Sequence, residues 1–198
     1  DGTHRRFIER LVRFWDFDSV IEDAHFVDCG LRYSGVPTDT LIINHLDGAL
    51  VDGLADGVPF EQLPVVDGKL ELGREASTVI VGLPYLSYGE ISRTEAGAED
   101  GTAQGKTKRI HNTTPFLWDS AYGELGIFNE DQEEDEWVDI EYREPYDEME
   151  PIKLQTGMFG PSIMPAHYGK RGSVLFRQTK PLPFNLIALM PQLDVQDR

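Results

Sequence analysis

A triplet with the chemistry of a nucleotide-binding loop lies near the middle of the chain, at Gly105-Lys106-Thr107. Such a loop needs Gly, four residues and then Gly-Lys-Ser/Thr, because its backbone amides must wrap closely around the phosphates. Asp100 stands where the first glycine is required, and its carboxylate repels phosphate. The following residues, RIHNTTPFLW at 109–118, predict a strand where the loop requires a helix. We therefore expect no nucleotide site and no cofactor.

Other catalytic and metal-binding patterns are incomplete. Asn129, Asp131, Glu133 and Asp135 alternate like calcium ligands, but Glu134 replaces the glycine that an EF-hand loop needs. Neither a Gly-x-Ser-x-Gly elbow nor a His-Glu-x-x-His pair is present. The five histidines are scattered and are expected to be satisfied surface or half-buried residues: His4, His25, His45, His111 and His167. We expect no metal site and no catalytic residue.

The single cysteine, Cys29, is expected to be a buried structural thiol, because neighbouring Asp28 raises its pKa instead of activating it. Paired carboxylates for glycoside hydrolysis have no diagnostic value in a chain with 35 acidic residues. A secreted hydrolase therefore stays open as an alternative.

A basic cluster stands out in this acidic chain. Lys106, Lys108 and Arg109 lie together, whereas 129–150 contains 12 acidic residues and Arg143 as its one base. The cluster is either a solvated loop or a bridge to the acidic segment of a neighbouring subunit. We take it as the candidate subunit interface.

Composition narrows the class of protein. A formal net charge of −17 disfavours specific reading of DNA or RNA by a basic face. With 40 % hydrophobic residues the 198-residue chain can bury a core. No apolar run is long enough to span a membrane, and we expect no membrane insertion. The start at Asp1, with neither Met nor a signal-peptide pattern, indicates a piece of a longer polypeptide.

Turn signals separated by β-branched and aromatic runs predict a mainly β chain: short-strand sandwich or barrel-like domains with long loops and at most one or two short helices. We expect a strand at 4–15, a brief helix within 18–25, a tight hairpin at 66–69, a buried strand at 78–81 and a final buried strand at 184–190. The expected domains are 1–35, a strand and linker continuing an upstream domain; 36–85, a small β-domain; and 86–198, a β-domain with a long loop at 86–109 and the acidic segment at 129–150.

Two stretches together resemble a known family. STVIVGLPYLSYGEI at 77–91 and DGTAQGKTKRIHNTTPFLWDS at 100–120 are similar to the C-terminal region of tail nozzle (tail tubular, or DNA-stabilisation) proteins of short-tailed bacteriophages. The similarity covers about residues 3–120 and does not include the acidic segment at 129–150. The residues that carry it are Gly82, Leu83, Pro84, Tyr85, Gly101, Gln104 and Gly105.

This resemblance implies a structural virion protein of the phage tail, without enzymatic activity. Identical subunits, usually six, form a ring around the channel for genome ejection and contact neighbouring tail proteins such as the adaptor and fibres. An acidic lumen then repels the DNA, which passes without specific binding.

The alternative is a glycan-binding tail module for receptor recognition. Trp15, Trp118, Trp137 and the tyrosines are then the residues that stack on sugar rings. Trp118 follows Phe116-Leu117, which favours a core position for its side chain.

Overall fold

The computed structural model of the chain describes residues 6–10, 19–95, 97–98, 101–142, 152–165 and 167–196. The fold is mainly β, which confirms the predicted class. Over the described residues, the helices are two short 3₁₀ turns, η1 (Ile21–Asp23) and η2 (Asn44–Leu46). The chain divides between Tyr85 and Leu86 into two compact units. Unit 1 holds the described residues up to Tyr85 with 152–153 and Lys180–Pro183, and unit 2 holds the others.

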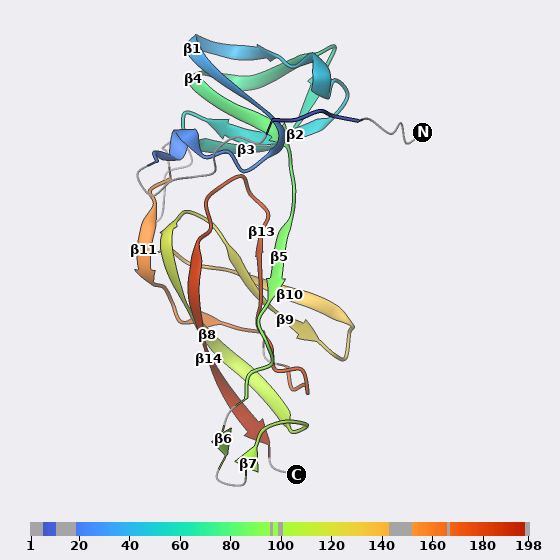
Figure 1. Cartoon of the computed structure of the whole chain (residues 1–198), viewed down its shortest axis with the longest axis vertical. Helices are drawn as coiled ribbons and strands as arrows, with labels where there is room; N and C mark the ends of the chain where they lie inside the picture. The colour runs from blue at the N-terminus through green and yellow to red at the C-terminus, as the bar shows by residue number, and fades with distance from the viewer. Residues whose placement is uncertain are drawn as a thin grey trace. The chain divides into compact units, whose positions relative to one another are not determined.

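Unit 1 is one antiparallel sheet around its own core (Figure 1). Its strands are β1 (Asp28–Ile42), β2 (Leu50–Ala55), β3 (Val58–Val66) and β4 (Lys69–Leu83), in the order β1-β4-β2-β3. Alternate residues on the strands face inward, so that Val51, Leu70 and Val79 are fully buried. Val79–Val81 are buried inside the strand expected at 78–81.

Turn chemistry explains how unit 1 folds back on itself. Val66 pairs with Lys69 across the predicted hairpin, and Asp67 and Gly68 have φ of 52° and 70°. Positive φ at both turn residues matches the twist of the flanking strands, and Asp-Gly accepts it. The segments KLELG and STVIV belong to a single strand, β4, which continues through Gly73 at a φ of +73°. Strand β1 continues through 35/36, so the expected domain boundary there falls inside one strand.

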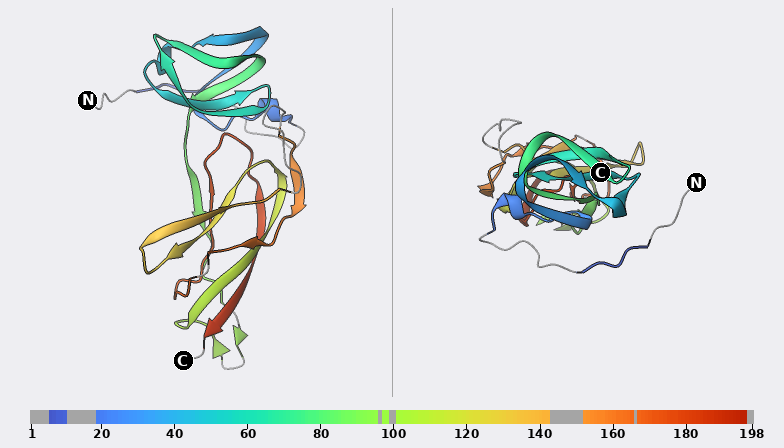
Figure 2. Two further views of the ribbon diagram at one scale, coloured as in Figure 1. Left: turned by 180° about the vertical axis from the view of Figure 1, so that it is seen from behind. Right: turned by 90° about the horizontal axis from the view of Figure 1, so that it is seen from above.

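Unit 2 contains two larger antiparallel sheets that enclose a second core, together with one short two-stranded sheet. One has the order β10-β9-β13-β5, and the other joins β11, β8 and β12, with β14 along β8. The strands are β5 (Ser87–Glu90), β8 (Thr107–Ser120), β9 (Glu124–Asn129), β10 (Glu134–Asp139), β11 (Gln155–Met158), β12 (Ser162–Ile163), β13 (Leu175–Gln178) and β14 (Leu186–Gln196). Leu117 of β8 and Leu125 of β9 are completely buried in this core. The β9–β10 hairpin extends away from the rest of unit 2 (Figure 1 and Figure 2).

Three expectations about element positions were wrong. The segment 86–109 is not one long loop, because it contains β5, the short pair β6 (Gly97–Ala98) and β7 (Gly101–Thr102), and the start of β8. The final strand is not buried, because Ile187 and Met190 are 59 % and 38 % exposed on β14. Residues 6–10 of the strand expected at 4–15 have no regular structure, and positions 11–15 lie outside the described residues.

Gly82 lies on β4 beside the start of strand β1, where there is no room for a side chain. A Cβ at Gly82 would lie 2.4 Å from the carbonyl oxygen of Asp28 and 2.8 Å from the Val27 side chain. Gly82→Ala is therefore expected to lower the free energy of unfolding by about 1–3 kcal/mol, the usual cost of overpacking. Chemical denaturation followed by circular dichroism measures it.

Gly35→Ala on β1 is the matched control. The atoms nearest to its added Cβ belong to the Tyr33 side chain, at 2.9 Å from the hydroxyl, and no backbone atom is among them. A side chain can shift where a backbone carbonyl cannot, so the cost of Gly35→Ala should be smaller than that of Gly82→Ala. Equal losses in the two variants would contradict this account of Gly82.

Candidate functional site

The basic cluster lies at the start of strand β8, and its three members have different environments. Lys106 is half-buried beside Gly105, whose φ of +76° allows the chain to turn into β8. Arg109 is half-buried, and its guanidinium carbon lies 5.7 Å from the centre of the Tyr168 ring. Both side chains retain contact with solvent. They are the members of the cluster that can meet another molecule.

Lys108 does not belong to this surface, which corrects its assignment to the subunit interface. Its side chain is 1 % exposed, and its ammonium donates a hydrogen bond of 3.0 Å to the carbonyl of Thr94. Glu95 supplies a carboxylate oxygen 4.0 Å away. Gly172 lies against the aliphatic part of the side chain. Burial of a cation demands such partners, so Lys108 is held within unit 2.

The two-residue period of a strand explains this placement. Ile110 is a core residue of β8, and Lys108 lies two positions before it, on the same side. If the strand predicted at 109–118 had been started at Thr107, the same alternation would have predicted from the sequence that Lys108 faces the core.

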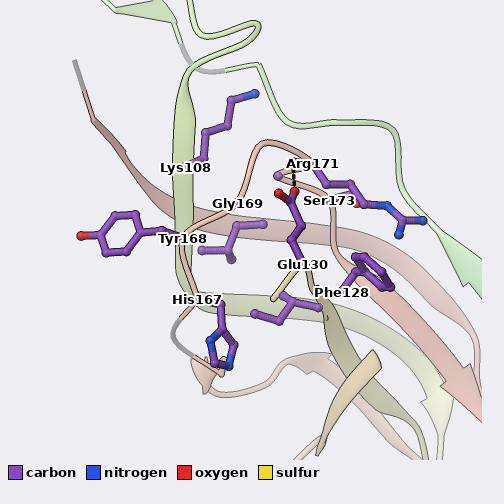
Figure 3. Close-up of a pocket in the computed structure, with 11 residues that line it drawn as sticks. Lys108, Phe128, Glu130, His167, Tyr168, Gly169, Arg171 and Ser173 are labelled. Atoms are coloured by element: carbon purple, nitrogen blue, oxygen red, sulfur yellow. Dashed lines mark hydrogen bonds between the residues drawn. The ribbon is translucent and has the colours of Figure 1, made fainter. Parts of the chain in front are cut away.

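A loop at 167–173 packs against Lys108 and closes a shallow pocket (Figure 3). Lys108 and Gly169 exchange two backbone hydrogen bonds, of 2.8 and 2.9 Å. Glu130 points at this loop from the β9–β10 turn and accepts hydrogen bonds from the backbone amides of Lys170 and Arg171. The cavity measures about 20 Å³, room for one water molecule. A cavity of this size is too small for an organic substrate. We therefore interpret the contact of Glu130 with the loop as a structural clamp.

Glu90 fastens the other end of the same loop. It receives two hydrogen bonds from the guanidinium of Arg171, of 2.8 and 2.6 Å, and a third from Ser173. These bonds hold the pKa of Glu90 below its ordinary value, against the opposing effect of partial burial. The Arg171 guanidinium also lies 4.7 Å from the centre of the Phe128 ring.

Glu124 is the most buried carboxylate of this region. Arg177 binds it at 2.6 and 2.5 Å, and Tyr122 and Thr179 also donate hydrogen bonds to it. Burial alone raises the pKa of Glu124, but the hydrogen bonds from Tyr122, Arg177 and Thr179 outweigh it and lower the pKa. The pKa of Tyr122 is raised by burial and by its bond to Glu124.

The residues of the family resemblance fall in both units. Gly82 and Leu83 end strand β4, and Pro84 and Tyr85 follow them at the end of unit 1. In unit 2, Gly101 lies in β7, and Gln104 and Gly105 form the turn before β8. Strand β8 after Gly105 confirms the strand predicted in place of a phosphate-loop helix. Proximity in sequence therefore does not make these residues one site.

The tryptophans differ from expectation. Trp118 is 42 % exposed, so its predicted core position was wrong. Trp137 has the Arg177 guanidinium 4.2 Å from its ring centre and Tyr88 edge-on at 5.9 Å. The Arg177 guanidinium therefore already lies over the Trp137 ring, on which a sugar ring would have to stack. Trp15 lies outside the described residues.

Cys29 and the acidic turn have structural roles. Burial raises the pKa of the Cys29 thiol to about 12, and the hydrogen bond that it donates to Glu9 acts in the same direction. The side-chain oxygen of Asn129 accepts backbone hydrogen bonds from Asp131 and Gln132, which closes the turn. Within the described part of the chain, no three His, Cys, Asp or Glu residues are arranged to hold a metal ion.

No model of a known protein family and no curated protein matches this sequence. None of the helices in the described residues has the length and apolar character needed to cross a membrane. The site is therefore interpreted from its own geometry: two accessible cations beside a firmly held loop and an acidic hairpin.

Acid should destabilise unit 2 through Glu90 and Glu124. Both carboxyls have a folded pKa below the ordinary value of 4.5, so the unfolded chain binds protons first as the pH falls. Their contribution is complete above about pH 5 and is lost progressively as the pH drops through the lowered folded values. Urea unfolding between about pH 7 and 3, followed by tryptophan fluorescence, measures the slope.

Glu124→Gln should lower the free energy of unfolding by about 2 kcal/mol at neutral pH, because Arg177 loses its carboxylate partner and keeps only part of its hydration. The same change should make the free energy of unfolding less dependent on pH in the acid range. Glu134→Gln, at an exposed position of the same hairpin, is the matched control and should leave the profile unchanged. An unaltered pH profile in Glu124→Gln would remove Glu124 from this role.

Proposed function

We propose that this chain is a structural virion protein, a subunit of the tail nozzle of a short-tailed bacteriophage. Identical subunits, six by resemblance, form a ring around the channel through which the genome is ejected. The proposal rests on the two sequence stretches at 77–91 and 100–120. One observation on the structure supports it: Lys108, Arg171 and Arg177 are bound by partners within the chain, whereas acidic residues are in large excess over Lys and Arg.

The charge distribution suits the wall of a DNA channel. Internal partners hold Lys108, Arg171 and Arg177, as described above. The net charge of −17, by contrast, leaves carboxylates in excess at the surface of the chain. Such a surface repels phosphates, so DNA slides past without being bound. No catalytic residue is needed for this function.

Closure of a ring needs a heterologous contact, in which one patch meets a different patch of the neighbour. Lys106 and Arg109 are the proposed basic side of that contact. The acidic β9–β10 turn is the proposed partner on the next subunit. The ring would also contact the adaptor and fibres of the tail.

A closed oligomer with an acidic inner surface is the expected form of the full-length polypeptide. Negative-stain images should show rings, and a reconstruction should place Asp and Glu in excess along the channel. A monomeric particle, or a channel lined by Lys and Arg, would overturn the proposal.

Charge reversal tests the basic side of the contact. Lys106→Glu with Arg109→Glu should weaken subunit association, and the wild-type association should itself weaken as salt rises. Sedimentation velocity measures both effects. Lys69→Glu, at an exposed position of β4, is the control for the added negative charge. Unchanged association would exclude Lys106 and Arg109 from the interface.

A glycan-binding tail module is the second candidate, and the exposure of Trp118 favours it. The indole stands on the outer face of a sheet beside half-buried Phe116, where a sugar ring has access. Trp137 is the weaker stacking residue because Arg177 lies over it.

A further inference from the structure

The outer face of the sheet formed by β11, β8, β12 and β14 carries no charge between Asn112 and Trp118 of β8, and Asp194 of β14 lies beyond this part, opposite Arg109. Across the ladders, Met158 and Ala188 pair with Phe116, and Met190 pairs with Thr114. The alternate residues of β8 point to the opposite, inner side of the sheet, where Thr113 and Leu117 are fully buried. We call this outer set the neutral face: Asn112, Thr114, Phe116, Trp118, Met158, Ile163, Ala188, Met190 and Gln192.

Large side chains of the neutral face are open to solvent. Trp118, Met158, Ile163 and Met190 are 42 %, 55 %, 77 % and 38 % exposed. Together they present on the order of 400 Å² of apolar surface, comparable to the largest patch on a typical monomer, which is often functional. Asn112, Thr114 and Gln192 add an uncharged polar margin, as in the rim of an interface.

The opposite sheet of unit 2 has a different outer face. There Asp135, Asp139 and Arg177 lie on the side of Trp137, and Glu124 binds Arg177. One outer side of the sandwich thus carries charges around its aromatic residues, whereas the part of the other side between Asn112 and Trp118 carries none. Burial of the neutral face against a partner does not require removing an ion from water.

We infer that the neutral face is the surface through which one copy of this chain docks on a second copy. The inference rests on the proposed function, since it names a contact surface of the ring subunit. Two copies, each with a net charge of −17, repel one another over most of their surface. Contact through the neutral face adds no carboxylate from that face to the interface and buries exposed Trp, Met and Ile side chains.

Charged side chains border the neutral face at both ends of β8. Near the start of the strand, Arg109 pairs across the ladder with Asp194 of β14, whose carboxylate lies 3.7 Å from His111. Near its end, Asp119 accepts a hydrogen bond from Thr156. In a ring, the surface that a neighbouring copy presents to the neutral face is a different part of the chain.

The area is consistent with a stable contact between copies. A standard interface takes about 800 Å² from each partner, with an apolar centre and a polar rim. The exposed apolar residues supply about half of that area, and Asn112, Thr114 and Gln192 provide a polar margin around them.

A carboxylate placed in the neutral face tests the inference. Met158→Glu and Ile163→Glu each add one negative charge at an exposed position, so folding should be preserved. Val36→Glu, at an 80 % exposed position of β1, adds the same charge elsewhere. Sedimentation velocity of the full-length polypeptide at roughly 0.5 M salt, where the screening length is about 4 Å, suppresses attraction between charged patches.

The expected result is self-association at least tenfold weaker in Met158→Glu and Ile163→Glu, and unchanged in Val36→Glu. Circular dichroism and the urea midpoint check that each variant is folded. Rings that persist in both neutral-face variants would overturn this inference and leave the proposed function standing.

Two other results separate the hypotheses. Open oligomers that the same variants abolish would support the neutral face and overturn the ring. A wild-type monomer that binds a glycan array, with binding lost in Trp118→Ala, would overturn both and assign the face to a glycan.

Discussion

Electrostatic self-repulsion is the constraint on which the rest of this structure depends. The chain carries 35 acidic residues against 18 Lys and Arg, so its cations are few and their positions matter. Several of them hold the chain together: Arg171 ties the 167–173 loop to Glu90, Arg177 neutralises Glu124, and Lys108 joins β8 to the segment at Thr94. Carboxylates without such partners are tolerated at the surface, where water solvates them.

The consequence is a sandwich with two unlike outer faces. The sheet containing β9 and β10 displays the charged side chains and extends the acidic hairpin. The sheet containing β8 and β14 displays the neutral face. The proposed nozzle subunit would need both kinds of surface, because the repulsion that keeps DNA from binding to a channel also drives the acidic subunits apart. These two outer faces relate the fold to the proposed ring.

The basic cluster illustrates the limit of linear motifs. Lys106, Lys108 and Arg109 are neighbours in sequence, yet the alternation of β8 turns Lys108 inward beside Ile110 and Arg109 outward, and Lys106 lies in the turn before the strand. Trp118 makes the same point in reverse. Its apolar neighbours suggested a core position, but it lies on the outward side of the strand that buries Leu117. Both were decided by which side of one strand faces the second core.

Local chemistry was sufficient to predict the β class, the Asp67-Gly68 hairpin, the short 3₁₀ turn after 18 and the strand after Gly105, because turn residues and β-branched runs act over a few neighbouring positions. Acidity and the lack of a phosphate-loop pattern were also explicit in the sequence. Pairing between distant segments was not: Met158, Ala188 and Phe116 meet only because β11 and β14 flank β8. The clamp of Glu130 on the loop at Lys170 likewise joins residues 40 positions apart. Such contacts depend on the order and register of the strands. Order and register are set when the inner faces of the two sheets are buried against one core, so only the tertiary structure decides them.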